Sequence, residues 1–471
     1  MEKTKIIATF GPSCDSRDVL KKLFANGLDV LRINMSYATH EECLKIIKMV
    51  NSINDELGTH VSIMMDTKGN CITIDKLSGG KATLKTGDKI RIYKNKVIGD
   101  STKFSTSFQN FVDETRIGSN LKINDGLIEL EVIDKNEEYL LCLVMIGGEI
   151  EEGRKIIVPN VTYSLPFLTS KDYEDVIFAC NNDVDFLALS NVRSHEDVLN
   201  INDILIEQNN DHLQIIAKIE TRESLDELDN IIASSDGTMV ARGDLGVELP
   251  IERVPSIQKM IINKCHINGK ISIVATEMMS SMTHEMRPTR AEVSDVANAV
   301  LDGADAVMLS GETTIGVHPV ETLIMMSKIL ASTEENIDYL DFLDKAMRTE
   351  KENITGIIAY SVAEAANRLH TKAIVTPTLS GMTAKKISRF RPKCLILATS
   401  PSLKTIKSLN LNFGVVPLYI NELNSLDKIM SKVTVLASEK LNLKENDKII
   451  ITGSYPFKEH NETNFMQITK I

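Results

Sequence analysis

The sequence contains no tryptophan, and only 5% of its 471 residues are aromatic. No apolar run approaches the roughly 20 residues that a membrane-spanning helix needs, and the amino-terminal residues do not follow the layout of a signal peptide. The seven cysteines include no C-x-x-C pair, so we expect neither a disulfide framework nor a cysteine metal site. These absences predict a soluble protein of the reduced cytoplasm.

Positive charge is also scarce. The chain has 53 basic against 65 acidic residues, a formal net charge of −12, and no basic run. Nucleic acids and anionic membrane surfaces attract the opposite balance, so we expect neither as a partner. The apolar share of 43% is typical of a globular protein, and 471 residues exceed what one hydrophobic core supports, so two or three domains are expected.

Short apolar runs recur along the first two thirds of the chain, and most are separated by about 15 to 30 residues with helical periodicity. The eight runs are Lys5–Phe10, Val30–Met35, Val61–Asp66, Val184–Ser190, Gln214–Glu220, Gly237–Gly243, Ile271–Thr276 and Ala306–Ser310. Strands that alternate with helices predict an α/β fold with a parallel sheet, and eight such units favour a closed (β/α)8 TIM barrel. A doubly wound open sheet is the alternative that the pattern leaves open.

The third and fourth runs lie too far apart for a single helix, and the sequence between them changes to short alternating strands and turns. This change predicts an inserted β-rich domain that acts as a lid over the carboxyl end of the barrel. After a polar join at Asn336–Asn353 the β-α alternation resumes, which predicts a C-terminal α/β domain. The expected division is a barrel formed by residues 1–67 and 165–340, a lid at 68–164, and a C-terminal domain at 341–471.

Charged side chains end two consecutive apolar runs, the first at Lys218 and Glu220 and the second at Asp244. Lys218 and Glu220 project to one side of a strand by its two-residue period, and if residues 237–243 form the next strand, Asp244 emerges beside them. Carboxylates suit Mg²⁺, and a lysine suits a phosphoryl group in transfer. The alternative is a buried ion pair beside a solvated loop. That alternative explains three charges at the ends of two apolar strands less well, because burying a charge is costly unless it is paired or functional.

A polar stripe marks the second strand, where the two-residue period places Arg32, Asn34 and Ser36 on one face. Oxygens of Asn34 and Ser36, together with those of Asp66 and Thr67 at the end of the third strand, form a candidate site for a monovalent cation. A hydrogen-bond network at the strand ends is the alternative. Arg32 is a candidate phosphate clamp, or else the salt-bridge partner of a nearby carboxylate such as Asp66.

Hydroxyl side chains mark two further positions. Thr276 ends the seventh strand and is expected to face the same mouth, although a lone threonine there is also typical of a helix N-cap. In the C-terminal part a hydroxyl-rich turn opens a helix after a strand, and such a turn forms either an anion nest or a simple N-cap cluster. Its hydroxyls belong to Thr378, Ser380 and Thr383.

Ordered motifs along nearly the whole chain resemble those of the pyruvate kinase family. They are IATFGPS at 7–13, RINMS at 32–36, DTKG at 66–69, KIE at 218–220, VARGDLG at 240–246, RPTRAE at 287–292, SDVANAVLDG at 294–303 and MLSGET at 308–313. In this order and spacing the set is far more specific than a lone glycine motif. The resemblance implies a (β/α)8 barrel with a lid and a C-terminal regulatory domain, assembled as a homotetramer.

The activity that the resemblance implies is transfer of the phosphoryl group of phosphoenolpyruvate to ADP, giving pyruvate and ATP. It implies that Glu220 and Asp244 hold Mg²⁺, that Lys218 neutralises the phosphoryl charge and that Arg32 holds the phosphate. It implies that the backbone of Gly243 and Asp244 binds the substrate carboxylate together with Thr276, and that Thr276 and a water chain protonate the enolate. The K⁺ site that it implies is formed by Asn34, Ser36, Asp66 and Thr67. It also implies nucleotide contacts for Asn34, Tyr37 and Arg154, and a sugar-phosphate effector site at Thr378, Ser380 and Thr383.

The chain departs from the family pattern beside these positions. The family usually continues its DTKG motif with PEIR, whereas residues 70–73 are NCIT here. Thr73 lacks the charge of an arginine that touches the nucleotide phosphates, and Cys71 replaces a glutamate that goes with K⁺ dependence. Tyr37 stands at a common histidine position and Arg154 at a lysine position. These changes predict altered handling of ADP or K⁺.

Two other functions stay open at this point. One is a catalytically impaired paralogue that binds phosphoenolpyruvate or a phosphorylated effector in a regulatory role. Residues 70–73 motivate it, and the complete set of Arg32, Lys218, Glu220 and Asp244 argues against it. The other is an aldolase-type barrel that acts on pyruvate with Mg²⁺, which gives no account of the lid or the third domain. The sequence therefore favours a Mg²⁺-dependent phosphotransferase.

Overall fold

Eight parallel strands close into a barrel, so the barrel prediction is confirmed over the open sheet. The computed structural model describes residues 1–471 except 211, 351–352, 422–425 and 456–461. Each of the eight apolar runs contains one barrel strand, and the sixth strand is shorter than expected. Around the barrel the order is β1 (Lys5–Thr9), β16 (Ala306–Leu309), β15 (Ile271–Ala275), β14 (Gly237–Ala241), β13 (Gln214–Ile219), β12 (Phe186–Leu189), β3 (Ser62–Asp66) and β2 (Val30–Asn34).

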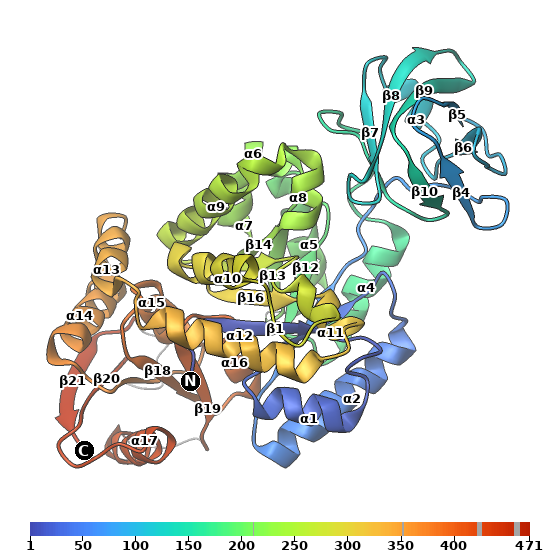
Figure 1. Cartoon of the computed structure of the whole chain (residues 1–471). Helices are drawn as coiled ribbons and strands as arrows, with labels where there is room; N and C mark the ends of the chain where they lie inside the picture. Colours follow the sequence, from blue (N-terminus) through green and yellow to red (C-terminus); the bar gives the residue numbers. More distant parts are fainter. Residues whose placement is uncertain (211, 351–352, 422–425, 456–461) are drawn as a thin grey trace.

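Helices cover the outside of the barrel (Figure 1). Capping boxes fix where several begin: Thr39, Thr169 and Thr289 each accept a hydrogen bond from the third helical residue, whose carboxylate accepts one in return. Short segments at strand–helix connections are α8 (Arg242–Glu248), η1 (Ile251–Arg253), η2 (Ser280–Thr283) and α11 (Gly311–Thr314). The covering helices are α1 (Arg17–Ala25), α2 (His40–Leu57), α4 (Ser170–Asn181), α5 (His195–Glu207), α6 (Arg222–Asp226), α7 (Leu228–Ser234), α9 (Val254–Asn268), α10 (Arg290–Asp302) and α12 (Pro319–Glu334).

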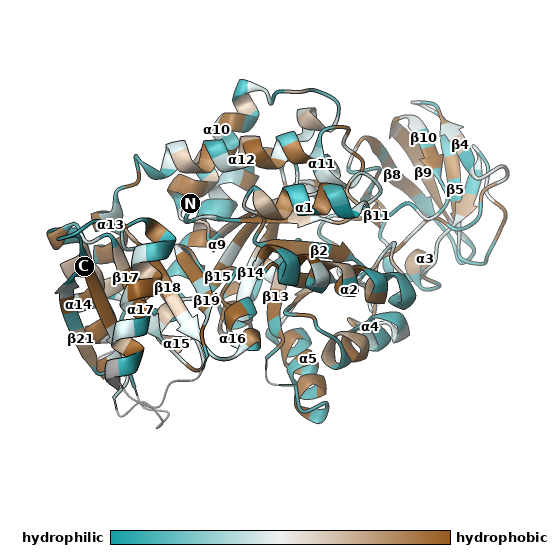
Figure 2. Ribbon diagram, turned by 90° about the horizontal axis from the view of Figure 1, so that it is seen from below, coloured by the Kyte–Doolittle hydropathy of each residue, from teal (hydrophilic) through white to brown (hydrophobic). Residues whose placement is uncertain are grey.

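Apolar side chains fill the barrel and the layer between its strands and helices. The interior cluster includes Met64, Phe186 and Met239, all fully buried. Leu411, from the C-terminal part of the chain, belongs to the same cluster and closes the end where the strands begin. Figure 2 shows the hydrophobic strands of the barrel against the mixed, outward-facing surfaces of α1 and α2. The opposite end, where the strands finish, is left for polar side chains.

The chain between β3 and α4 forms the inserted β-rich part, for which we keep the name lid; it stands apart from the barrel in Figure 1 and has its own hydrophobic cluster around Phe104 and Phe111. Its two connections to the barrel pair with each other at Thr73 and Lys155. We call these connections, residues 70–74 and 153–157, the hinge ribbon. The lid contains a six-stranded sheet in the order β11 (Ile156–Ile157), β7 (Asn120–Ile123), β8 (Ile128–Lys135), β9 (Tyr139–Ile146), β5 (Lys89–Tyr93) and β6 (Lys103–Ser105), the pair β10 (Gly148–Glu151) and β4 (Lys81–Leu84), and α3 (Phe111–Glu114).

The C-terminal part is built on a five-stranded sheet, in which only the edge strand β21 is antiparallel. The expected polar join is wrong in part, because residues 339–348 form a helix that buries Tyr339, Leu343 and Ala346 on one face. None of the helices formed by described residues has the length and apolar character needed to span a bilayer. The sheet order is β19 (Val415–Tyr419), β18 (Leu395–Ser400), β17 (Ala373–Pro377), β20 (Lys448–Gly453) and β21 (Phe465–Lys470), and the helices are α13 (Tyr339–Arg348), α14 (Ile354–Leu369), α15 (Met382–Arg389), α16 (Leu403–Ser408) and α17 (Leu426–Leu441).

Candidate active site

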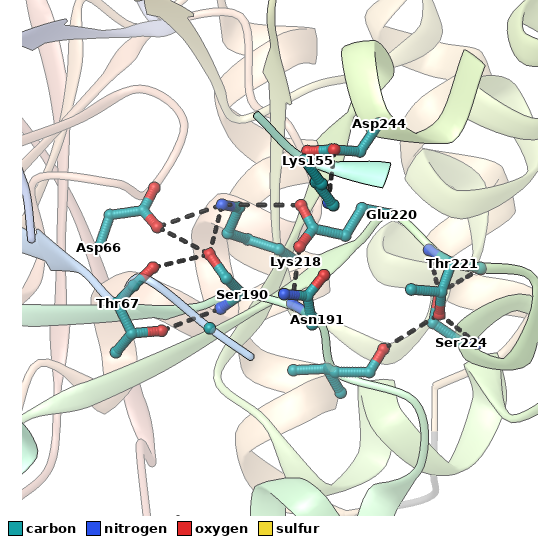
Figure 3. A network of polar contacts seen from close by, with 12 residues as sticks. Asp66, Thr67, Lys155, Ser190, Asn191, Lys218, Glu220, Thr221, Ser224 and Asp244 are labelled. Atoms are coloured by element: carbon teal, nitrogen blue, oxygen red, sulfur yellow. Dashed lines mark hydrogen bonds and ion pairs between the residues drawn. The ribbon is translucent and has the colours of Figure 1, made fainter. Parts of the chain in front are cut away.

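A lysine that is only 12% exposed connects the carboxyl ends of three neighbouring strands (Figure 3). Lys218 Nζ donates to Ser190 Oγ at 2.6 Å and to Asp66 Oδ1 at 3.1 Å, and it lies 3.6 Å from Glu220 Oε2. The residues converge because β13 pairs with β12, and β12 with β3, so the ends of these strands lie side by side. The sequence prediction that Lys218 and Glu220 face the same side is confirmed.

Asp66 neutralises two cations of this network. Its side chain is 1% exposed, and its Oδ2 accepts a hydrogen bond from Arg32 Nε at 2.7 Å. Burial alone would raise the pKa of Asp66, but the charges of Arg32 and Lys218 lower it, so the carboxylate is ionised. Burial alone would lower the pKa of Lys218, but the carboxylates of Asp66 and Glu220 raise it above its usual value. Arg32 is thus the salt-bridge partner of Asp66, and it stays at the mouth of the barrel.

Glu220 and Asp244 form the second part of the site. Glu220 Oε1 accepts the Asn191 backbone N–H at 2.6 Å, whereas its buried Oε2 accepts no hydrogen bond from any described residue. Asp244 forms an ion pair with Lys155, whose Nζ lies 2.7 Å from Asp244 Oδ1. Burial raises the pKa of Glu220 against the opposing charge of Lys218, and Asp244 adds to the rise. Burial would raise the pKa of Asp244 too, but Lys155 lowers it.

Asp244 lies in a different secondary-structure element from the one expected. Strand β14 ends at Ala241, and residues 242–248 form α8, so Asp244 lies in the first turn of a helix and not at the end of a strand. A carboxylate in the first turn interacts favourably with the positive end of the helix dipole. The predicted strand over residues 237–243 is therefore wrong at its end, although Asp244 does lie close enough to Glu220 for its charge to raise the pKa of that carboxyl.

The two carboxylates fit a hard divalent cation. Glu220 Oε2 lies 3.6 Å from Lys218 Nζ but accepts no hydrogen bond from any described residue, and a buried oxygen without a donor costs free energy. The Lys155 ammonium beside Asp244 shows that the pair attracts positive charge. Mg²⁺ is commonly bound by one or two carboxylates and completes its shell with water and substrate oxygens. Among the described residues, no three His, Cys, Asp or Glu side chains form a denser metal cluster.

Thr276 follows β15 with an unusual backbone. Its φ is 74°, in the left-handed region that β-branched residues rarely adopt. Arg242 NH2 donates to the Thr276 carbonyl at 2.6 Å, and its NH1 donates to Asp295 Oδ2 at 2.6 Å, so the guanidinium holds this turn in place. Gly243 packs against the turn, since a Cβ there would lie 3.0 Å from Thr276 Cγ2. Thr276 caps none of the described helices, and it lies against the start of α8.

The residues predicted to bind a monovalent cation form two neighbouring pairs. Thr67 joins the lysine network through Ser190, whose N–H donates to Thr67 Oγ1 at 3.1 Å and whose Oγ donates to the Thr67 carbonyl at 2.8 Å. The Ser36 N–H donates to Asn34 Oδ1 at 3.0 Å, and the strand register places Asn34 beside Asp66. One detail of the prediction is wrong: β2 ends at Asn34, so Ser36 is an exposed turn residue and not part of the strand face.

A cavity of about 870 Å³ opens beside Arg32 and is lined by two of the three predicted nucleotide residues, Asn34 and Tyr37. The Tyr37 side chain is 88% exposed. Arg154 lies elsewhere, on the lid, in an ion pair with Glu151 at 2.7 Å. The cation that faces the carboxylates from this part of the lid is thus Lys155.

The hydroxyl-rich turn precedes α15, and its hydroxyls differ in their surroundings. Thr378 Oγ1 accepts the Gly381 N–H at 2.9 Å, and Thr383 Oγ1 lies 2.8 Å from Thr463 Oγ1. Ser380 is exposed. Two of the three hydroxyls therefore form internal hydrogen bonds.

Sequence reasoning missed three residues that shape the site. Ser190 ends an apolar strand, which is the same signal that identified Lys218, so a consistent use of that rule would have found it. Arg242 was known only as part of a motif, and its contact with Thr276 depends on the pairing of β14 with β15. Lys155 has no local signal, because its contact with Asp244 depends on how the lid returns to the barrel.

The fold and the site define a barrel enzyme with an inserted lid, in which a charged lysine lies between two carboxylates at the strand ends. Residues 1–323 match the family model described as pyruvate kinase, barrel domain, and residues 357–469 match the one described as pyruvate kinase, alpha/beta domain. The chain belongs to the pyruvate kinase family. The resemblance drawn from the motifs is confirmed.

Individual relatives agree with this assignment over the full length. The pyruvate kinase of Clostridium perfringens is 39% identical over 100% of both chains. That of Sporosarcina psychrophila is 40% identical over 99% of this chain and 80% of its own. A crystal structure of a pyruvate kinase from Cryptosporidium parvum matches with a TM-score of 0.93 at 35% identity, covering 100% of this chain and 96% of the other.

Proposed function

We propose that this chain is a pyruvate kinase in activity as well as in family, transferring the phosphoryl group of phosphoenolpyruvate to ADP. The observation that carries the proposal is the position of Lys218, a largely enclosed ammonium held between Asp66 and Glu220 at the barrel mouth. Phosphoryl transfer leaves little covalent chemistry for the protein, so fixed positive charge at the transferring group is its main contribution. Nothing in the comparisons or the described structure favours the non-catalytic alternative.

Arg32 and Lys218 are the residues that hold the phosphoryl group. Both donate to Asp66, which orients them, while each retains further N–H donors for phosphate oxygens. Glu220 and Asp244 would hold Mg²⁺, which would supply further charge neutralisation for the phosphoryl group. The substrate carboxylate binds at the backbone of Gly243 and Asp244.

Thr276 lies against Gly243 and protonates the enolate through a water chain after the phosphoryl group has left. Its strained backbone is fixed by Arg242, so the hydroxyl is positioned before the substrate arrives. ADP enters the cavity beside Arg32, where Asn34 and Tyr37 contact it, and Arg154 reaches the nucleotide from the lid.

The remaining assignments rest on the family and complete the proposal. K⁺ binds among Asn34, Ser36, Asp66 and Thr67, and a sugar phosphate binds at Thr378, Ser380 and Thr383 as an effector. The enzyme acts as a homotetramer in the cytoplasm. The division into barrel (1–67 and 165–340), lid (68–164) and C-terminal domain (341–471) is supported by separate hydrophobic clusters in the three parts.

Pyruvate formation from phosphoenolpyruvate and ADP tests the proposal, measured with and without Mg²⁺ and with K⁺ replaced by Na⁺. We expect turnover that requires Mg²⁺. The ratio of rates in the two salts then shows whether Cys71 has removed the K⁺ requirement. Folded protein that forms no pyruvate under any of these conditions would contradict the proposed activity.

A further inference from the structure

Lys155 is the residue through which the lid contacts the carboxylate pair. It lies on the hinge ribbon, and its Nζ is 2.7 Å from Asp244 Oδ1 on the barrel. The two side chains are 34% and 33% exposed, so the pair is open to solvent cations.

We propose that Lys155 is an internal competitor for the divalent cation. The lysine and the cation are alternative partners of Asp244, and Lys155 leaves Asp244 when the cation binds. This inference rests on the proposed function, which assigns Mg²⁺ to Glu220 and Asp244. Glu220 Oε2 accepts no hydrogen bond from a described residue and is not the oxygen that Lys155 contacts, so Glu220 remains available to the cation while Lys155 is on Asp244.

The same lysine links the metal site to the lid. The Ile156 N–H donates to the Ile72 carbonyl at 2.8 Å, and the Ile74 N–H donates to the Arg154 carbonyl at 3.0 Å, so both connections of the lid move as one ribbon with Lys155 on it. When Lys155 leaves Asp244, the ribbon loses its ionic contact with the barrel. Cation binding and the position of the lid are therefore coupled through one side chain.

A second lid lysine supplies a matched control. Lys122 Nζ donates to the Val247 carbonyl at 2.9 Å, so it contacts the same helix α8 as Lys155 does, but through a backbone oxygen. Lys122→Met and Lys155→Met each remove one positive charge with which the lid contacts α8. Only Lys155→Met removes a competitor of the cation.

Mn²⁺ binding to the full chain, measured by electron paramagnetic resonance without phosphoenolpyruvate or nucleotide, tests the competition. Because a cation that must displace a charged partner binds with reduced apparent affinity, we expect Lys155→Met to bind Mn²⁺ about tenfold more tightly, or about 1.4 kcal/mol. We expect Lys122→Met to stay within about twofold of the unmodified chain. Equal affinity in the unmodified chain and Lys155→Met, or an equal gain in Lys122→Met, would overturn the inference.

A measurement on the unmodified chain keeps the test independent of how the variants fold. Reductive methylation, read out by peptide mass, reports how accessible each lysine amine is. We expect Mn²⁺ to increase methylation of Lys155 severalfold and to leave Lys122 unchanged. If methylation of Lys155 does not rise with Mn²⁺, the lysine does not leave Asp244 and the inference is wrong.

Asp244→Asn separates this inference from the proposed function. If Mn²⁺ binding is lost in Asp244→Asn but is the same in the unmodified chain and Lys155→Met, the metal site stands and the competition is refuted. If Mn²⁺ binding is insensitive to Asp244→Asn, the metal site itself is assigned wrongly, and both statements fail. Loss in Asp244→Asn together with a gain in Lys155→Met supports both.

Discussion

Replacing Asp66 by Asn removes the negative charge that two buried cations share. Arg32 Nε lies 2.7 Å from one oxygen of Asp66 and Lys218 Nζ lies 3.1 Å from the other. Removing one partner of a buried ion pair costs about 3–5 kcal/mol, and because Glu220 remains near Lys218, we expect the low end, about 3 kcal/mol. At roughly 2–4 °C per kcal/mol, the Tm falls by about 6–12 °C. Turnover falls as well, since Arg32 and Lys218 lose the group that orients them.

The assay follows from the composition. With no tryptophan in the chain, thermal unfolding is followed by circular dichroism at 222 nm. The matched control is Glu56→Gln, since Glu56 also bridges two cations, Arg17 at 2.9 Å and Lys21 at 2.5 Å, but on the surface. We expect no measurable change in Tm from that variant. An Asp66→Asn protein as stable as Glu56→Gln would refute the reasoning.

The pH dependence of the Tm difference between the unmodified chain and Asp66→Asn gives a second test. The folded pKa of Asp66 is lowered, so its contribution to stability is present above the unfolded pKa of about 3.9 and is lost as the pH falls through the folded value. The difference in Tm between the unmodified chain and Asp66→Asn therefore shrinks in acid. A difference that grows below pH 4 would contradict the assignment of Asp66 as an ionised partner of Arg32 and Lys218.

Three further substitutions test other parts of the site and the fold. Gly243→Ala places a Cβ 3.0 Å from Thr276 Cγ2 and should lower kcat about tenfold or more. In the control Gly246→Ala, the atom nearest to the new Cβ is 3.8 Å away, and kcat should not fall. Equal effects of the two substitutions would exclude the close contact as the cause. Thr73→Arg should lower KM for ADP by restoring a charged phosphate contact, and an unchanged KM would mean that the contact is supplied elsewhere. Burial raises the pKa of Asp185 to about 7, so the stability of the unmodified chain relative to Asp185→Asn should fall by roughly 4 kcal/mol as the pH rises from about 4 to 7, measured by chemical denaturation of both proteins; a difference that does not change with pH would contradict the buried, neutral carboxyl.

The barrel was predictable because its strands are buried on both faces and read as apolar runs of regular spacing. The error at the sixth strand has a physical cause. Strand β14 ends at Ala241, where the partner strand β15 also ends at Ala275, and Gly243 and Gly246 gave no sign that a helix follows. The C-terminal edge strand β21 escaped prediction because its outer positions, such as Met466 and Ile468, are exposed apolar residues in a mixed sequence.

The centre of the site was also predictable, since the two-residue period of a strand is enough to bring Lys218 and Glu220 together. What the sequence could not supply are the contacts made across large separations. Lys155 meets Asp244 only because the lid returns to the barrel along the hinge ribbon, and Arg242 meets Thr276 only through the neighbouring strand. Both are side-chain contacts that no local pattern encodes.

The central claim is that the ammonium of Lys218 stabilises the phosphoryl group in transfer. The most direct test is pyruvate formation from phosphoenolpyruvate and ADP with saturating Mg²⁺, comparing the unmodified chain with Lys218→Met under single-turnover conditions. Loss of one preorganised charge at the reacting group predicts a rate lower by about 10²–10³-fold or more, with Mn²⁺ binding retained. A Lys218→Met protein that forms pyruvate at the unmodified rate would contradict the account.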